Sequence, residues 1–390
     1  MMRKIMIVFL IGAIALLGAV PVLAQQTWGT LQEYEKATGK MIEKFSEAPT
    51  LKVKVAAGEL PPVEERLPEE PLVVEPVEEI GRYGGVWHQV HTGNYAQNSY
   101  KLNEALVCYS TDWTKIQPNV AKSWKFSENG KSITFFLRKG MKWSDGAPFT
   151  SDDFIFWYED IVLNDELTPV KPEWLKVGGE LGKFEKIDDY TLRISFAQPY
   201  GIVLERLAME LCYAPKHYLK QFHPKYTSMD KIKEMMKKES FDTWEDLFGD
   251  KNTHLNNPGC PQIDLFIPLN KYDQPIQTYI RNPYSWKIDT EGNQLPYIDK
   301  IERTLASDAE TAVLKALAGE VDFQWRHIAN LDNYPLFMEY REKSDYRLVP
   351  YLSGGYIYGA IYFNFHHKDP VLRKLFRDKR FRIALSLAIN

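Results

Sequence analysis

Three acidic residues, Asp152, Asp153 and Glu159, have the type and spacing that could do chemistry in this chain of 390 residues. Two carboxylates can act as general acid and base in glycoside hydrolysis, so Asp152 or Asp153 with Glu159 could serve a secreted glycosidase. Both aspartates, however, follow Thr150 at the expected start of a helix, where the helix dipole favours negative charge. We therefore favour a structural role for these acids.

Two other places could bind a metal ion. His254 and Cys260 share a loop, but two potential ligands without a third do not make a zinc site. His366 and His367 are adjacent on an expected strand, where successive side chains point to opposite faces. The sequence also contains no GxSxG, HExxH or GxxxxGK[ST] motif. We therefore predict no catalytic residues, no metal and no other cofactor, and we expect that the protein is not an enzyme.

The elements that position the acidic residues lie between residues 118 and 162. Asn129-Gly130 favours the positive φ angles of a two-residue hairpin turn, and alternating apolar residues after it indicate a strand. Thr150 stands three residues before Asp153, which resembles a capping box and predicts a helix start. Large side chains then follow at helical spacing: Phe154, Trp157, Tyr158 and Ile161. This stretch predicts a hairpin, a turn and a capped helix.

The same stretch, VAKSWKFSENGKSITFFLRKGMKWSDGAPFTSDDFIFWYEDI, resembles the signature of the family 5 extracellular solute-binding proteins. These proteins are the receptors of peptide, nickel and oligosaccharide ABC importers. Three later stretches are similar to the same family, in the family's order: Glu185 to Pro199, Arg281 to Val321 and Phe376 to Asn390. Together the motifs cover most of the chain from about Gly84 onward.

The resemblance implies an α/β fold of the periplasmic-binding-protein type (type II, cluster C), with two lobes and an extra β-rich subdomain. Residues 84–300 would form the first lobe, with the β-rich subdomain at about residues 110–200. Residues 301–390 would begin a second lobe that is incomplete, because the chain stops within an apolar-striped helix. The family places a crossing between lobes at residues 298–323, where we predict a strand, a helix capped at Ser307, and a second strand from Val321.

Candidate ligand contacts follow from the positions that the family places near its cleft. The loop after the first strand contributes Asn94, Tyr95 and Asn98, and Tyr109 and Trp113 are weaker candidates because aromatic side chains there can also pack beneath the next strand. After the crossing, the indole of Trp325 could stack on a ligand and Arg326 could bind an oxygen atom. A packed Trp325 with a surface Arg326 is the alternative. Tyr356, in an aromatic-rich segment, completes the set.

The first 24 residues predict a secretory signal peptide. Arg3 and Lys4 precede an apolar run that ends in the small-residue site at Ala24. An uncleaved anchor is the alternative, because the run could just reach across a bilayer. No cysteine lies near the site, which excludes lipid attachment there. We expect cleavage after Ala24 and a soluble protein in the periplasm or outside the cell.

Residues 25–83 are expected to form an N-terminal leader. We predict a surface helix from Leu31 to Phe45, followed by an extended surface segment through the Pro- and Glu-rich run from Pro61 to Glu79. A binding role for this acidic run is the alternative to a solvated face.

The three cysteines, Cys108, Cys212 and Cys260, cannot all pair within one molecule. A Cys108–Cys212 bridge stays open, but buried free thiols are favoured.

The formal net charge of −4, with mixed signs, offers no basic field for nucleic acid. By resemblance, the protein would bind an oligopeptide or oligosaccharide between its lobes, close around it as a monomer and deliver it to a membrane permease. Its 10 Trp, 22 Tyr and 20 Phe residues suit flat sugar faces, although aromatic residues equally form cores. The segment from Tyr284 to Asp299, typical of the family's larger variant, favours oligosaccharides. A nickel receptor of the same family and the glycosidase are the alternatives.

Overall fold

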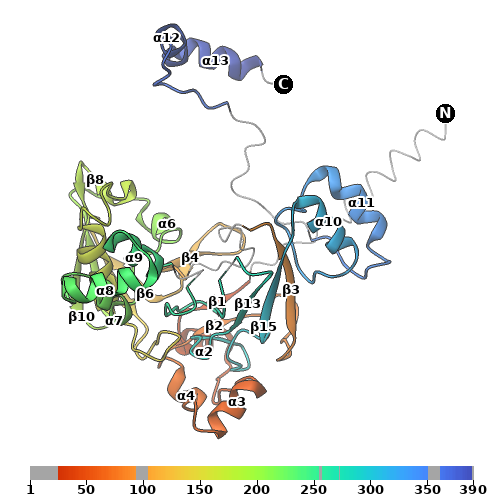
Figure 1. The fold of residues 1–390 in the computed structure, drawn as a ribbon. Coiled ribbons are helices and arrows are strands. Elements are labelled where there is room, and N and C mark those ends of the chain that lie inside the picture. The colour runs from red at the N-terminus through yellow and green to blue at the C-terminus, as the bar shows by residue number, and fades with distance from the viewer. Residues whose placement is uncertain (1–24, 94–103, 254–256, 272, 350–360, 389–390) are drawn as a thin grey trace, which may run out of the picture. The chain divides into compact units, whose positions relative to one another are not determined.

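A computed structural model describes residues 25–93, 104–253, 257–271, 273–349 and 361–388 (Figure 1). The chain divides into two compact units, Met1–Leu348 and Val349–Asn390. Among the described residues of the second unit are the helices α12 (Pro370–Arg377) and α13 (Lys379–Ala388). Helix α12 begins at Asp369, whose carboxylate accepts a hydrogen bond from the backbone N–H of Val371 at 2.7 Å. In the described ranges, no helix combines the length and the hydropathy needed to cross a membrane.

The leader builds a three-stranded sheet together with a strand from much later in the chain. The strands are β1 (Thr27–Trp28), β2 (Leu72–Val74) and β14 (Lys287–Asp289), in the order β1-β2-β14. Three helices accompany them: α2 (Leu31–Thr38), α3 (Pro49–Ala56) and α4 (Val63–Arg66). Strand β2 is antiparallel to β1 and parallel to β14, so it is the central strand of this sheet.

Two predictions for the leader are wrong. The helix expected from Leu31 to Phe45 ends at Thr38, because Gly39 adopts a left-handed conformation with φ of 73°. The segment from Pro61 to Glu79 is not a solvated surface strand, because it contains α4 and the central strand β2. Val73 is fully buried there, packed in a cluster with Ile288 of β14. Apolar pairing with a distant strand therefore outweighs the Pro- and Glu-rich composition.

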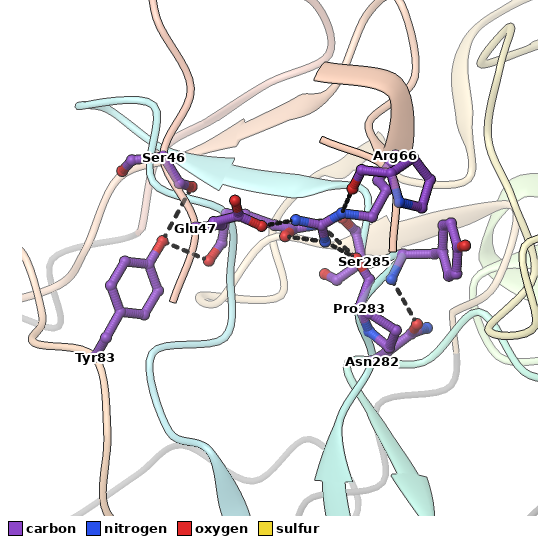
Figure 2. A network of polar contacts seen from close by, with 10 residues as sticks. Ser46, Glu47, Arg66, Tyr83, Asn282, Pro283 and Ser285 are labelled. Atoms are coloured by element: carbon purple, nitrogen blue, oxygen red, sulfur yellow. Dashed lines mark hydrogen bonds and ion pairs between the residues drawn. The ribbon is translucent and has the colours of Figure 1, made fainter. Parts of the chain in front are cut away.

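Arg66 is fully buried and anchors this leader through the polar contacts that Figure 2 shows. Its guanidinium forms an ion pair with Glu47 and donates hydrogen bonds to the carbonyl oxygen of Pro283 and to Oε1 of Gln294. Tyr83 adds a hydrogen bond from its hydroxyl to the Gln294 carbonyl oxygen at 2.9 Å. The leader is thus joined to the 283–294 segment by buried, charge-assisted hydrogen bonds.

The predicted hairpins form a four-stranded antiparallel sheet in the order β10-β11-β7-β6. Its strands are β6 (Ala121–Phe126), β7 (Ser132–Leu137), β10 (Lys183–Asp188) and β11 (Thr191–Ser195). The hairpin between β6 and β7 is confirmed, but its two-residue turn is wrong. Only Gly130 takes positive φ, and Ser127 closes a longer loop by donating its N–H to the Ser132 carbonyl oxygen. The Asn129 side chain supports this loop by accepting from the Lys131 N–H at 3.0 Å.

The predicted capped helix is confirmed as α5 (Ser151–Phe156), which continues as the π-helical turn η2 (Trp157–Val162). Thr150 and Asp153 form the complete capping box. Phe154 and Tyr158 are buried in one cluster with Phe135 of β7 and Leu192 of β11, so the helix covers the antiparallel sheet. The other elements of this region are β4 (Val107–Tyr109), β5 (Ile116–Pro118), η3 (Glu173–Leu175), β8 (Lys176–Val177), β9 (Glu180–Leu181), α6 (Val203–Leu207), α7 (Lys216–Leu219), η4 (Lys220–Phe222), α8 (Met229–Glu239) and α9 (Trp244–Lys251).

A second four-stranded sheet has the order β12-β13-β15-β3. Its strands are β3 (Val86–His91), β12 (Phe266–Pro268), β13 (Ile276–Arg281) and β15 (Lys300–Leu305). Figure 1 shows the orange β3 beside the blue-green β15, and these two strands pair in parallel. Helix α10 (Ala309–Leu317) follows and packs Ala312 and Val313 on Val90 of β3. The elements η5 (Leu331–Asn333) and α11 (Tyr334–Tyr340) complete this part.

The strand and the helix predicted between residues 298 and 323 are both found, but the helix cap is one residue later than expected. Asp308, not Ser307, is the N-cap, and its carboxylate accepts from the Thr311 N–H at 2.7 Å. The hydroxyl of Ser307 instead donates a hydrogen bond to the Asp308 carboxylate at 3.0 Å.

All three cysteines are free, so the Cys108–Cys212 bridge is wrong. Cys212 and Cys260 are buried as predicted, whereas Cys108 is half-buried.

Candidate functional site

Tyr109 and Trp113, two of the predicted ligand contacts, are brought together by the short hairpin of β4 and β5. Their ring centroids lie 4.8 Å apart and the ring planes are inclined by 31°. The Trp113 side chain is 50% exposed, whereas Tyr109 is half-buried. The Tyr109 ring therefore covers part of the indole, and the side chain of Trp113 still keeps 50% of its surface exposed to solvent. The two residues form an exposed aromatic pair.

The turn that carries Trp113 is held by the carboxylate of Asp112. Oδ1 of Asp112 accepts hydrogen bonds from the Ser110 hydroxyl at 2.5 Å, the Thr114 hydroxyl at 2.8 Å and the Thr114 N–H at 3.1 Å. These hydrogen bonds lower the pKa of the Asp112 carboxyl group, and the bond from the Ser110 hydroxyl makes the largest contribution. Trp113 itself has φ of 60°, a left-handed conformation that a bulky residue rarely adopts. The turn therefore fixes an exposed tryptophan in a strained backbone position.

Trp325 and Arg326 follow a segment that runs along the edge strand β3. The N–H of Asp322 donates to the His88 carbonyl oxygen at 3.0 Å, and the His88 N–H donates to the Asp322 carboxylate at 2.6 Å. The predicted strand from Val321 is wrong, because side chains of the segment, rather than a backbone ladder, pair with β3. Trp325 and Arg326 are both half-buried, with the guanidinium carbon 5.9 Å from the indole centroid.

A buried polar layer, formed by Gln89, His91, Gln277 and Arg303, was not predicted from the sequence. Gln89 of β3 and Gln277 of β13 both stand opposite Arg303 of β15, so the three side chains share one face of the sheet. Arg303 donates to Oε1 of Gln277 at 2.9 Å. Both amide atoms of Gln89 and Nε2 of His91 have no hydrogen-bond partner in the described structure. The alternation of Trp87, Gln89 and His91 along β3 is the signal that could have revealed this layer.

Burial lowers the pKa of His91 to about 4, and the positive charge of Arg303 and the nearby His327 add to this shift. The imidazole is therefore neutral at pH 7 and can donate or accept a hydrogen bond. Buried polar groups in folded proteins are almost always hydrogen-bonded. Gln89, His91, Gln277 and Arg303 are each at most 1% exposed, so the amide, imidazole and guanidinium groups of this layer lie inside the protein and do not face solvent.

Two of the three acidic residues considered for hydrolysis, Asp152 and Asp153, form structural contacts, whereas Glu159 is exposed. The Asp153 carboxylate is buried and accepts hydrogen bonds from the Thr150 N–H at 3.0 Å, from Nε1 of Trp143 at 3.2 Å and from the Lys216 N–H at 3.2 Å. Burial raises its pKa to about 6. Asp152 forms an ion pair with Lys186 at 3.1 Å. These contacts fix the start of α5, in agreement with the structural role that the sequence favoured.

Four predicted contacts, Asn94, Tyr95, Asn98 and Tyr356, lie outside the described residues, as does His254. His366 and His367 belong to the second compact unit. In the part of the chain that the structure describes, no group of three or more His, Cys, Asp or Glu side chains is arranged to hold a metal ion. The structure thus brings Tyr109 and Trp113 together and places Trp325 beside Arg326, while the ligand-binding roles of all eight predicted contacts stay predictions.

Known proteins are similar to this chain in sequence and in fold. The family described as bacterial extracellular solute-binding proteins, family 5 (middle), matches residues 115–390. A periplasmic alpha-galactoside-binding protein of Rhizobium meliloti (strain 1021) is 30% identical over 371 residues, which are 86% of this chain and 50% of that protein. This chain spans about half the length of the curated relatives that it matches.

Two solved structures are similar over most of the chain. An oligopeptide-binding protein OppA is 45% identical with a TM-score of 0.81, over 93% of this chain and 58% of that one. The periplasmic binding protein MelB of Agrobacterium fabrum C58, solved in complex with stachyose, is 30% identical with a TM-score of 0.62, over 77% of this chain and 46% of that one. The mixed α/β fold is that of periplasmic binding proteins, and this chain belongs to the bacterial extracellular solute-binding proteins of family 5.

Proposed function

We propose that this protein is the substrate-binding component of an ABC importer, which captures an oligosaccharide or an oligopeptide and delivers it unchanged to a membrane permease. The observation that carries the proposal is the similarity over 93% of the chain to a solved solute-binding protein at 45% identity. The relative named for alpha-galactosides and the stachyose-bound structure favour an oligosaccharide. The structure named as an oligopeptide-binding protein favours a peptide.

The mechanism that we propose is closure of two lobes around the solute. Residues 84–300 would form the first lobe, with the antiparallel sheet of β6, β7, β10 and β11 in its β-rich subdomain, and residues 301–390 would begin the second. A ligand shifts such an equilibrium only by its differential affinity for the closed form. A shift from 1:99 to 99:1 needs about 5.5 kcal/mol, which a few ring contacts and hydrogen bonds can supply. No covalent step is required.

The ligand contacts that we propose are the predicted set: Asn94, Tyr95, Asn98, Tyr109, Trp113, Trp325, Arg326 and Tyr356. Two contacts inside the described ranges support the set, the ring contact between Tyr109 and Trp113 and the placement of Arg326 beside Trp325.

The cellular setting belongs to the same proposal. The names of the alpha-galactoside-binding relative and of the stachyose-bound structure describe periplasmic proteins. They support a periplasmic location for this chain. Our proposal adds cleavage of the signal peptide after Ala24 and work as a monomer beside a permease.

Isothermal titration calorimetry of the secreted protein tests the proposal. Stachyose and a mixed oligopeptide library are titrated separately, and the recovered solute is analysed by mass spectrometry. We expect saturable binding of one class and recovery of the solute without cleavage. Absence of heat and of a thermal shift with both classes would overturn the receptor function. Release of smaller sugars would instead support the glycosidase alternative.

A further inference from the structure

We propose that Trp113, backed by Tyr109 and presented by the Asp112 turn, is a subsite that stacks on a pyranose ring of the solute. This inference rests on the proposed receptor function. It makes that function more specific, because it assigns a carbohydrate as the ligand of Tyr109 and Trp113. It depends on the geometry of three residues in one hairpin and not on the residues outside the described ranges.

The first support is that the exposure of Trp113 is enforced by the backbone. A left-handed φ of 60° is costly for any residue with a Cβ and is usual for glycine, yet this position carries the largest side chain. Such strain persists where the surrounding structure over-determines it, and it is concentrated at functional sites. Here the three hydrogen bonds to Oδ1 of Asp112 and the bond from the Trp113 N–H to the Ser110 carbonyl oxygen at 2.8 Å fix the turn.

The second support is the pre-organised indole face. The Tyr109 ring lies 4.8 Å from the indole centroid, so rotation of the Trp113 side chain is restricted on that side. The exposed part of the indole is apolar, and a side chain held in this way loses little rotamer freedom when a ligand covers it. A rigid, solvent-facing aromatic plane of this kind matches the C–H-bearing face of a pyranose ring, whose positively polarised hydrogens meet the negative face of the π system.

The third support is the carboxylate of Asp112, the residue before Trp113 in the same turn. Asp112 uses Oδ1 for all three hydrogen bonds within the turn, while in the described structure Oδ2 accepts none. An ionised carboxylate only accepts hydrogen bonds, and sugar hydroxyls that flank a stacked ring are donors. An aromatic plane with a hydrogen-bond acceptor on the neighbouring residue therefore suits a sugar, which presents both a C–H face and hydroxyl donors.

The test compares stachyose affinity in the wild-type protein with that in three variants by isothermal titration calorimetry. Trp113→Gly removes the indole and releases the backbone strain, so we expect its melting temperature to stay within about 2 °C of wild type while the stachyose Kd rises about tenfold or more. Trp113→Phe keeps a smaller ring and should weaken binding less. Phe126→Ala removes another exposed aromatic side chain, on β6, and should leave the Kd unchanged.

The outcomes separate this inference from the proposed function. If the wild-type protein binds stachyose and Trp113→Gly binds it equally well, the subsite is overturned and the receptor function stands. If the wild-type protein binds only peptides, the receptor function again stands and the pyranose assignment is overturned. If it binds neither class, both fail. An equal loss of affinity in Trp113→Gly and Phe126→Ala would also overturn the subsite, because the effect would then be nonspecific.

Discussion

Gln324 satisfies both backbone hydrogen-bonding groups of Val90 with its side-chain amide. Oε1 accepts from the Val90 N–H at 3.2 Å, and Nε2 donates to the Val90 carbonyl oxygen at 3.1 Å. The side chain thus takes the place of a neighbouring strand at the edge of β3. Nε2 also donates to the Arg326 carbonyl oxygen at 2.8 Å, so the same amide orients the segment that carries Trp325 and Arg326.

Loss of this amide should detach the segment from β3. In Gln324→Ala, the two Val90 groups lose their partners, and we expect the free energy of unfolding to fall by about 1–3 kcal/mol. Urea unfolding measures the change. Gln221→Ala is the matched control, because Gln221 donates only one exposed hydrogen bond, to the Tyr218 carbonyl oxygen. Equal stability of the two variants would contradict a special role for the Gln324 amide.

Arg138 should hold the leader on the rest of the chain. It is fully buried and donates to the Asn119 carbonyl oxygen at 2.8 Å, to Gly29 at 2.6 Å and to Glu70 at 2.7 Å, and two of these acceptors lie in the leader. We expect Arg138→Met to cost about 3 kcal/mol or more, because three buried carbonyl groups lose a charged donor.

Limited proteolysis should then release the leader faster from Arg138→Met than from wild type. Arg193→Ala is the control for loss of an arginine, because Arg193 is exposed and pairs with Glu185 at the surface. Exposed pairs contribute little, about 0–1 kcal/mol. A leader that stays protected in Arg138→Met would show that the sheet of β1, β2 and β14 holds it without the arginine.

Local patterns predicted those elements whose partners are close in sequence. Period-two alternation identified β7 and β11, and the spacing of Thr150 and Asp153 identified the start of α5, because hairpins and caps form from neighbouring residues. The position of β2 could not be predicted, because its burial depends on β14, more than two hundred residues later. Composition there indicated a solvated segment, whereas tertiary pairing buried it.

In the candidate site, too, contacts between residues close in sequence could be predicted, whereas contacts between distant strands could not. Tyr109 and Trp113 share one hairpin, so their proximity could be expected from the sequence once the hairpin was assumed. The strained φ of Trp113 could not be expected from the sequence, because no local rule places tryptophan in a left-handed turn. Gln89 and Arg303 meet only because β3 and β15 pair in parallel, and one strand alone gives no sign of the other.

The stability of the protein should depend on pH through His91. Because its pKa in the folded protein, about 4, lies below the ordinary 6.5, the unfolded chain binds a proton that the folded chain does not between these values. Stability should therefore fall as pH is lowered from 6.5 to 4, by up to about 1.4 kcal/mol per pH unit from this group. His91→Gln should flatten the slope, which urea unfolding across this pH range measures.

The carboxyl group of Asp153 should change the stability of the protein in the opposite direction over part of the same pH range. Its pKa of about 6 lies above the ordinary 3.8, so the folded state binds the extra proton and stability rises as pH falls from 6 to 3.8. Asp153→Asn should consequently make the loss of stability at acid pH steeper, while His91→Gln makes it shallower. Parallel slopes in the two variants and the wild type would show that neither group titrates differently on unfolding.

The structural role of Asp153 can be separated from catalysis by a third substitution. Asp153→Ala leaves the Trp143 Nε1–H, the Thr150 N–H and the Lys216 N–H without their acceptor, and we expect a loss of about 2–4 kcal/mol in unfolding free energy. Glu159→Gln, on the exposed side of η2, should change stability by less than about 0.5 kcal/mol. If the two acids worked as a hydrolytic pair, both variants would lose the release of products from stachyose that the wild type then shows. We expect instead that wild type and both variants return the sugar intact in mass spectrometry, so that only thermal melting distinguishes them.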